Sequence, residues 1–243
     1  MDVFSTMDKR RSTRAYLDKP VARAQIEEIF KYAGLAPSAI NLQPWEYVVV
    51  YGEEKDRLVR RLLQVHAERQ IPCGPGTSTR PPEIFTRRSR EASDSMEPRV
   101  AETGQTLNRF VEEGSCSFYG APLAIIVTID RLFPKLRYLD LGLSISYLLL
   151  AAEARGLGTC PIGLITAYAA DIADVLSIPE NKEVVLGIAL GYADESSPVN
   201  NFKTSRADRS EILYWSEKVS DARCKFRVTS CGLEPVRQRM GRL

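Results

Sequence analysis

Apolar residues recur along this chain with the spacing of helices and strands. Residues 22–34 and 56–68 carry apolar side chains three and four positions apart, which predicts two amphipathic helices. Residues 46–51 and 123–129 are rich in valine, isoleucine, alanine or tyrosine and have strand length, and residues 184–192 form a similar run punctuated by glycine. The pattern therefore predicts strands in alternation with helices.

The stretch 138–155 is apolar almost all round, which predicts a helix at the centre of the fold or in a large interface. Its longest apolar run includes Asp140, Ser144 and Ser146 and is shorter than the ~20 residues that cross a bilayer, so we expect no membrane partner. Few strands separated by long helical segments favour an α+β fold, with helices on both sides of a sheet, over a doubly wound nucleotide fold.

The composition of the chain changes between residues 71 and 99, which are rich in proline, glycine and charged residues. Such a stretch cannot bury enough apolar area to order itself, so we expect a mobile insertion over a site, with simple disorder as the alternative. We assign residues 1–215 to one domain that includes this insertion. Residues 212–215 are expected to be an apolar anchor, and residues 216–243 a charged extension.

Composition narrows the classes of function. The net charge is +2 with acids and bases interspersed, which gives little support to a nucleic-acid partner. No basic, apolar and small-residue succession precedes the first motif, so a cytoplasmic location is expected. Five cysteines without a close pair favour free thiols over disulfides or a metal site; Cys224 and Cys231 in the tail are the nearest two.

Three arginines and two hydroxyl residues stand within five positions near the N-terminus, in the run Arg10-Arg11-Ser12-Thr13-Arg14. Charges of one sign cannot be buried without a counter-charge, and guanidinium groups match phosphate oxygens in a bidentate way. The run predicts a phosphate clamp at the start of a helix. Ordinary solvated surface arginines are the alternative.

A second polar run, residues 37–44, ends in Pro44 and precedes Trp45. Ser38, Asn41 and Gln43 offer hydrogen-bond donors and acceptors suited to a flat heterocycle, although a plain turn uses the same residue types. Further on, Gly156 and Gly158 follow the long helix and indicate helix termination rather than a dinucleotide fingerprint.

Lys203 and Arg206 again suit a phosphate, with a solvated loop as the alternative. His66, the only histidine, has no Asp or Ser constellation around it, so we interpret it as a surface residue rather than a general base. Cys160 has no neighbouring histidine and is interpreted as a small packed residue. The chemistry is therefore expected to come from a cofactor that the protein positions.

The order of these motifs over residues 8–215 resembles the FMN-dependent nitroreductase family. That resemblance implies a three-layer α-β-α sandwich with a mixed, mostly antiparallel sheet, in an intertwined homodimer whose active sites lie at the subunit interface. It also implies which residues bind FMN. The expected set is Arg10, Arg11, Ser12, Arg14, Pro37, Ser38, Ala39, Asn41, Pro161, Ile162, Gly163, Lys203 and Arg206.

Within this set the resemblance implies different roles. Arg10 and Ser12 would hold the phosphate or ribityl oxygens, and Arg14 would lie at the pyrimidine edge, where it stabilises the negative charge of the reduced ring. Ala39 stands where relatives often have a second serine. Gly163 stands where some relatives have a glutamate, although a backbone N–H donor needs no side chain.

The implied activity is that of an FMN-dependent NAD(P)H oxidoreductase without a catalytic side chain or metal. A nicotinamide would pass hydride to flavin N5 and leave, and an acceptor such as a nitroaromatic, quinone or enone would take its place. The alternatives are a specialised reductive dehalogenase, a flavin-fragmenting enzyme, and a non-catalytic flavin-binding redox sensor.

Overall fold

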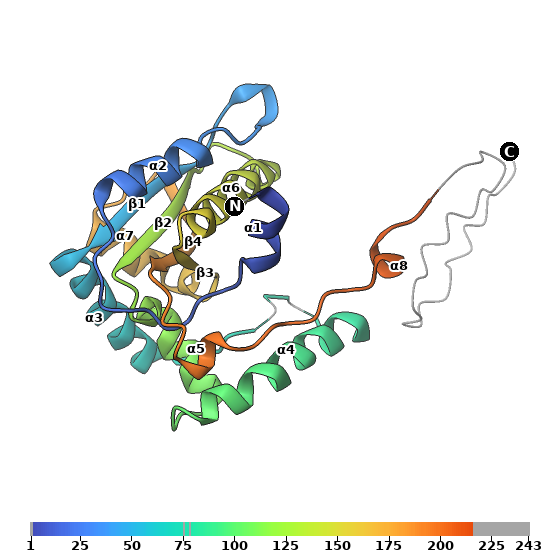
Figure 1. The fold of residues 1–243 in the computed structure, drawn as a ribbon. Helices are drawn as coiled ribbons and strands as arrows, with labels where there is room; N and C mark the ends of the chain where they lie inside the picture. The colour runs from blue at the N-terminus through green and yellow to red at the C-terminus, as the bar shows by residue number, and fades with distance from the viewer. Residues whose placement is uncertain (1, 75, 78, 216–243) are drawn as a thin grey trace, which may run out of the picture.

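A computed structural model describes residues 2–74, 76–77 and 79–215 of the chain. Its centre is a four-stranded sheet in the order β1-β2-β4-β3, in which every neighbouring pair is antiparallel (Figure 1). The strands are β1 (Glu46–Tyr51), β2 (Leu123–Asp130), β3 (Gly158–Ile162) and β4 (Lys182–Gly191). The three predicted strands are confirmed. The fourth, β3, begins at Gly158, one of the two glycines interpreted above as a helix end.

Helices cover both faces of the sheet. On one face lie α2 (Arg23–Ala33) and α6 (Tyr138–Ala154), and on the other α3 (Gly52–Arg69), α5 (Leu107–Cys116) and α7 (Ala169–Leu176) (Figure 1). Successive side chains of β2 alternate between the two cores, since Ile125 packs with the α2–α6 cluster and Ile126 with the α3–α7 cluster. The expected three-layer α+β sandwich is confirmed.

The insertion expected to be mobile contains a long helix, α4 (Glu83–Ala101), so the prediction is wrong for residues 83–99. Glutamate, arginine, alanine and methionine are good helix formers, which the count of prolines and charges concealed. The helix also has an apolar attachment at its end. Val100 is fully buried against Phe110 and Val199, and Met96 packs beside them.

The last described part of the chain, residues 203–215, forms what we call the C-terminal arm. It runs beside α4 and away from the sheet, and it includes the short helix α8 (Arg209–Ile212) (Figure 1). The side chains of Ile212 and Trp215 are 63% and 82% exposed, so these residues do not anchor the arm to their own domain. The expectation that residues 212–215 anchor the chain there is wrong. Residues 216–243, with Cys224 and Cys231, lie outside the described residues.

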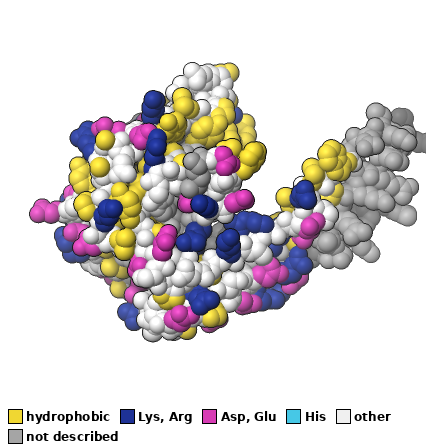
Figure 2. All heavy atoms as spheres, viewed as in Figure 1, with side chains coloured by type: hydrophobic (Ala, Val, Ile, Leu, Met, Phe, Trp, Pro, Cys, Tyr) yellow, Lys and Arg dark blue, Asp and Glu magenta, His cyan; other side chains and the backbone are white. Residues whose placement is uncertain are grey.

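The long helix α6 faces the core with only one side. Leu141 and Leu148 are buried against the sheet, whereas Leu139, Leu143 and Tyr147 are 42% to 66% exposed. Beside it lies α1 (Val3–Lys9), which also exposes apolar side chains (Figure 2). None of the described helices has the length and hydropathy needed to cross a membrane.

Candidate functional site

We expected the arginine run to start a helix. Instead, it continues from α1 as an extended segment. Ser12 forms an isolated parallel bridge with Thr159 of β3, and the Thr13 amide donates a hydrogen bond to the Thr159 carbonyl oxygen at 2.9 Å. The next helix, α2, begins at Arg23, close to its predicted start. The arginines therefore lie along one edge of the sheet.

Arg14 is held at both its backbone and its side chain. Its amide donates to Oδ1 of Asn200 at 2.8 Å, and its guanidinium carbon lies 5.8 Å from the ring centroids of both Tyr119 and Phe202. Its Nε is buried, and no described atom accepts a hydrogen bond from it. A buried donor without a partner is costly, so this atom marks a place where a ligand acceptor fits.

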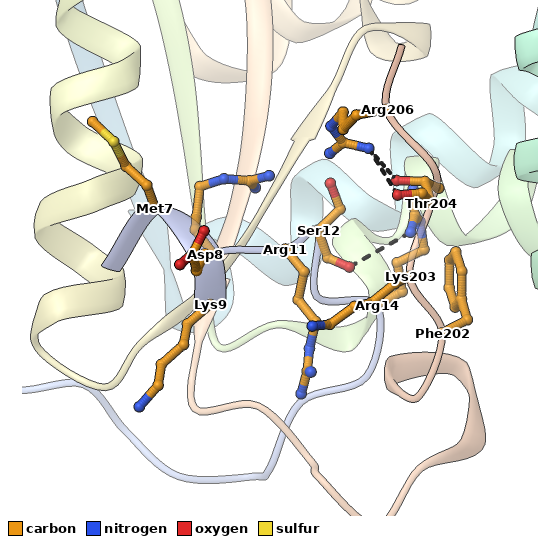
Figure 3. Close-up of a pocket in the computed structure, with 11 residues that line it drawn as sticks. Met7, Asp8, Lys9, Arg11, Ser12, Arg14, Phe202, Lys203, Thr204 and Arg206 are labelled. Atoms are coloured by element: carbon orange, nitrogen blue, oxygen red, sulfur yellow. Dashed lines mark hydrogen bonds between the residues drawn. The ribbon is translucent and has the colours of Figure 1, made fainter. Parts of the chain in front are cut away.

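A cavity of about 380 Å³, which we call the basic cavity, lies between the arginine segment and the start of the C-terminal arm (Figure 3). Most of its lining residues carry a charge. The lining consists of Met7, Asp8, Lys9, Arg10, Arg11, Ser12, Arg14, Phe202, Lys203, Thr204 and Arg206. Thus all six of the predicted residues from positions 10–14 and 203–206 meet here, although about 190 residues separate the two motifs in the sequence.

A second cavity of about 420 Å³ adjoins the basic cavity and shares Asp8, Lys9, Arg11 and Lys203 with it. Glu153, at the end of α6, lines this second cavity. Burial raises the pKa of its carboxyl group, while Arg11, Arg10 and Lys9 act in the opposite direction. Cations outnumber acids six to one around the basic cavity, an arrangement that suits an anionic ligand, whereas three cations and three acids line the second cavity.

The second polar run, residues 37–44, which we call the polar turn, does not line the basic cavity of its own chain. It protrudes between α2 and β1, and Ile40 at its tip is 90% exposed (Figure 1). Asn41 and Gln43 have positive φ angles of 59° and 47°, and Oγ of Ser38 accepts a hydrogen bond from the Gln43 amide at 3.0 Å. Among the described residues, the structure therefore keeps the predicted Pro37, Ser38, Ala39 and Asn41 apart from the arginines.

Pro161 and Ile162 end strand β3, and Gly163 follows it. All three lie outside the lining of the basic cavity. Ile162 is buried and Gly163 is exposed. Cys160, just before them, is a free buried thiol whose pKa is raised by burial, as expected of a packed residue that is not a nucleophile.

Sequence reasoning missed Tyr119, Asn200 and Phe202. Asn200 and Phe202 stand next to the Lys203 motif, so proximity in the sequence is a usable signal for them. Tyr119 lies 105 residues after Arg14 in a segment without any motif, and only the fold brings the two together.

His66 is not the surface residue that its helix suggested. Its side chain is 12% exposed, its Nδ1 lies 2.8 Å from the Tyr168 hydroxyl oxygen, and its Nε2 lies 3.8 Å from a Glu112 carboxylate oxygen. Its two partners lie just before α7 and in α5, and His66 does not line the basic cavity. Over the described ranges, no group of three or more His, Cys, Asp or Glu side chains has a geometry that could hold a metal ion.

Known proteins resemble both the sequence and the structure of this chain. A 4-nitrobenzoate reductase of Pseudomonas putida is 33% identical over 84% of this chain and 91% of that protein. A chloronitrobenzene nitroreductase of Comamonas testosteroni is 30% identical over 84% of this chain and 92% of that protein. The crystal structure of the FMN-dependent nitroreductase NfnB from Mycobacterium smegmatis in complex with NADPH is 28% identical, with a TM-score of 0.78, and the match covers 89% of this chain and 100% of that chain.

The same assignment comes from comparison with a family model. Residues 7–192, from α1 to the end of β4, match the model described as the nitroreductase family. The match includes the arginine run, the polar turn and all four strands. This chain belongs to the nitroreductase family.

Proposed function

We propose that the protein is an FMN-dependent NAD(P)H oxidoreductase that reduces nitroaromatic compounds. The observation that carries the proposal is the meeting of Arg10, Arg11, Lys203 and Arg206 around one cavity that also contains Arg14. Relatives named as nitrobenzoate and chloronitrobenzene reductases, and a similar fold determined with NADPH, support the same activity.

The donor set of the basic cavity fits FMN. Guanidinium and ammonium groups bind phosphate oxygens, and the Ser12 hydroxyl adds a neutral donor. The buried Nε of Arg14 has no acceptor among described atoms and suits a carbonyl or ring nitrogen at the pyrimidine edge. When bound, FMN accepts hydride from a nicotinamide and delivers electrons to the acceptor.

The protein's own residues then have separate tasks. The phosphate-facing cations bind and orient the cofactor, and Arg14 places fixed positive charge where the reduced ring becomes negative. Because preorganised charge needs no rearrangement during the reaction, it stabilises the reduced state more effectively than water does. Nitroaromatics are the proposed electron acceptors, and quinones and enones are the alternative acceptors.

The site is completed by a second copy of the chain. Leu139, Leu143 and Tyr147 of α6 and Phe4 of α1 present an exposed apolar surface of the kind that oligomers bury. The polar turn, which lies outside the basic cavity of its own chain, is then available to the ring of the partner's FMN. This homodimer acts in the cytoplasm.

Purified protein tests the proposal directly. Arg10→Ala and Arg206→Ala should each weaken FMN binding, because each removes a charged hydrogen-bond donor worth about 1.5 to 3 kcal/mol. Arg23→Ala is the matched control, since the Arg23 side chain is 88% exposed on α2. The native protein should be yellow, lose its colour with NAD(P)H and regain it with 4-nitrobenzoate. Colourless protein that does not take up added FMN would refute the assignment.

A further inference from the structure

The turn after α5 is strained at two large side chains. Phe118 and Tyr119 have φ angles of 51° and 52°, and Gly120 follows with 73°. Bulky residues rarely adopt this left-handed region, and such conformations persist only where the surrounding structure demands them. Phe118 is fully buried in the core. The same turn places the Tyr119 ring centroid 5.8 Å from the guanidinium carbon of Arg14, a residue that lines the basic cavity.

The surroundings of Tyr119 fix the position of its ring. A β-carbon at Gly114 would lie 2.5 Å from Cε1 of Tyr119, so the ring occupies the space that a side chain there would fill. The Phe110 ring packs at a centroid distance of 5.5 Å, and the Tyr119 hydroxyl lies 3.4 Å from Oγ of Ser115. The ring is thus held from its back and its edge.

The Arg14 guanidinium lies against the rings of Tyr119 and Phe202, with its carbon 5.8 Å from each centroid. Figure 3 shows Phe202 beside Arg14, immediately before the start of the C-terminal arm. No carboxylate among the described residues forms an ion pair with Arg14, and its guanidinium donates a hydrogen bond to the Ser12 carbonyl oxygen at 3.5 Å. Aromatic faces attract a cation without neutralising it.

We propose that Tyr119 is a positioning residue that holds the Arg14 guanidinium in place for FMN while leaving its charge available. A carboxylate would hold Arg14 as firmly, but it would cancel the positive charge that the reduced ring needs. The ring holds the cation through its quadrupole and excludes water from it. This inference rests on the proposed function, because it concerns the same cofactor.

Tyr119→Leu tests the inference through two measurements that do not depend on turnover. FMN binding to the apoprotein, followed by fluorescence quenching, should weaken about three- to tenfold through loss of the cation–ring contact. The midpoint potential of bound FMN should become more negative, because a poorly held Arg14 stabilises the reduced ring less. Tyr119→Phe keeps the ring and should stay within about twofold of the native affinity.

Phe110→Leu is the matched control, because Phe110 packs on Tyr119, whereas the cation–ring contacts of Arg14 are to Tyr119 and Phe202. It should leave both the affinity and the potential unchanged. Gly114→Ala displaces the Tyr119 ring without removing it and should reproduce the shift in potential; it also carries the test if Tyr119→Leu does not fold.

The outcomes separate this inference from the proposed function. Native apoprotein that binds no FMN would refute the proposed function. Native protein that binds FMN, together with Tyr119→Leu that keeps its affinity and potential, would refute the inference alone. An equal shift in Phe110→Leu would also refute it, because general packing would then account for the effect.

Discussion

Thr13 and Gly158 lie in direct contact, because the extended arginine segment pairs with β3 at this point. An ideal β-carbon on Gly158 would lie 2.4 Å from Oγ1 of Thr13, and the Thr13 amide is bonded to Thr159, the next residue along β3. The absence of a side chain at Gly158 thus lets the arginine segment approach the sheet. The glycines after α6 do more than end a helix.

Gly158→Ala should therefore push the arginine segment away from β3 and weaken FMN binding. Overpacking of this kind costs about 1 to 3 kcal/mol of folding stability. The measurements are urea unfolding and FMN titration of the apoprotein. Adding Thr13→Ala should partly restore both quantities, because Oγ1 and Cγ2 of Thr13 are then removed, while its Cβ, at 2.9 Å, remains.

Gly34→Ala provides the control for that prediction. The nearest atom to a β-carbon at Gly34 is 3.5 Å away, an ordinary contact, and its φ angle of −69° suits any residue. Affinity for FMN should be the same as in the native protein. Equal losses in Gly34→Ala and Gly158→Ala would contradict the close-approach explanation.

The fold was predictable from the sequence where the pattern was periodic or continuous. Helix α2, strands β1 and β2 and the long helix α6 all lie within a few residues of their expected positions. Helix α4 was missed because charge and proline content concealed good helix formers, and its burial depends on Val199, far along the chain. Pairing of β3 with β4 is likewise a tertiary contact that local sequence does not encode.

The candidate site was predictable where a motif carried charge. The arginine run and the Lys203–Arg206 motif meet in the basic cavity, because unpaired cations must face an anion or solvent. The polar turn and residues 161–163 do not line it, so their expected contacts with FMN stay predictions. Tyr119 could not have been found, since its role follows from a strained turn and a distant arginine.

A double substitution, Leu139→Glu with Leu143→Glu, should convert the proposed homodimer into monomers. Each leucine buried at an interface contributes about 1.5 to 3 kcal/mol, and a buried unpaired carboxylate opposes association further. Light scattering measures the molar mass of the native protein and of the double variant in solution. Monomers should also bind FMN more weakly, because the partner's polar turn is then lost.

Tyr51→Glu places a similar charge at the end of β1, outside α6 and α1, where Tyr51 is 62% exposed. This control should keep the native mass. Native protein that is monomeric, or a double variant that stays dimeric, would be inconsistent with α6 as the interface.

Glu211 ties the C-terminal arm to helix α4 and should support FMN binding indirectly. Its carboxylate accepts from Arg88 at 2.8 Å and Arg87 at 3.4 Å, while Glu91 of α4 accepts from Ser205 of the arm. Glu211→Arg should release the arm, which carries Lys203 and Arg206. Since each of the two partly exposed ion pairs contributes about 0.2 to 1 kcal/mol, the affinity should fall by no more than about thirtyfold.

Charge exchange provides the rescue for that variant. Arg88→Glu combined with Glu211→Arg should recover most of the affinity measured by FMN titration, because the pair is re-formed with opposite polarity. A double variant as weak as Glu211→Arg would show that the pairing does not position the arm.

Glu153 should make the stability of the protein depend on pH. Burial raises the pKa of Glu153 above its ordinary value of 4.5, so the folded state holds this proton more tightly than the unfolded state. That stabilisation is complete below pH 4.5 and is lost as the pH rises through the higher, folded-state pKa. At neutral pH the folded protein therefore contains a carboxylate that burial disfavours.

The side chain introduced by Glu153→Gln is uncharged at every pH, so the variant should be more stable than the native protein at about pH 7. The difference in stability should vanish at about pH 3, where Glu153 is protonated in both the folded and the unfolded protein. Urea unfolding followed by circular dichroism across this range measures the change. Glu180→Gln, at an exposed site, is the control and should show no such pH-dependent gain. A Glu153→Gln variant that is less stable at neutral pH would mean that attraction to Arg11, Arg10 and Lys9 outweighs burial.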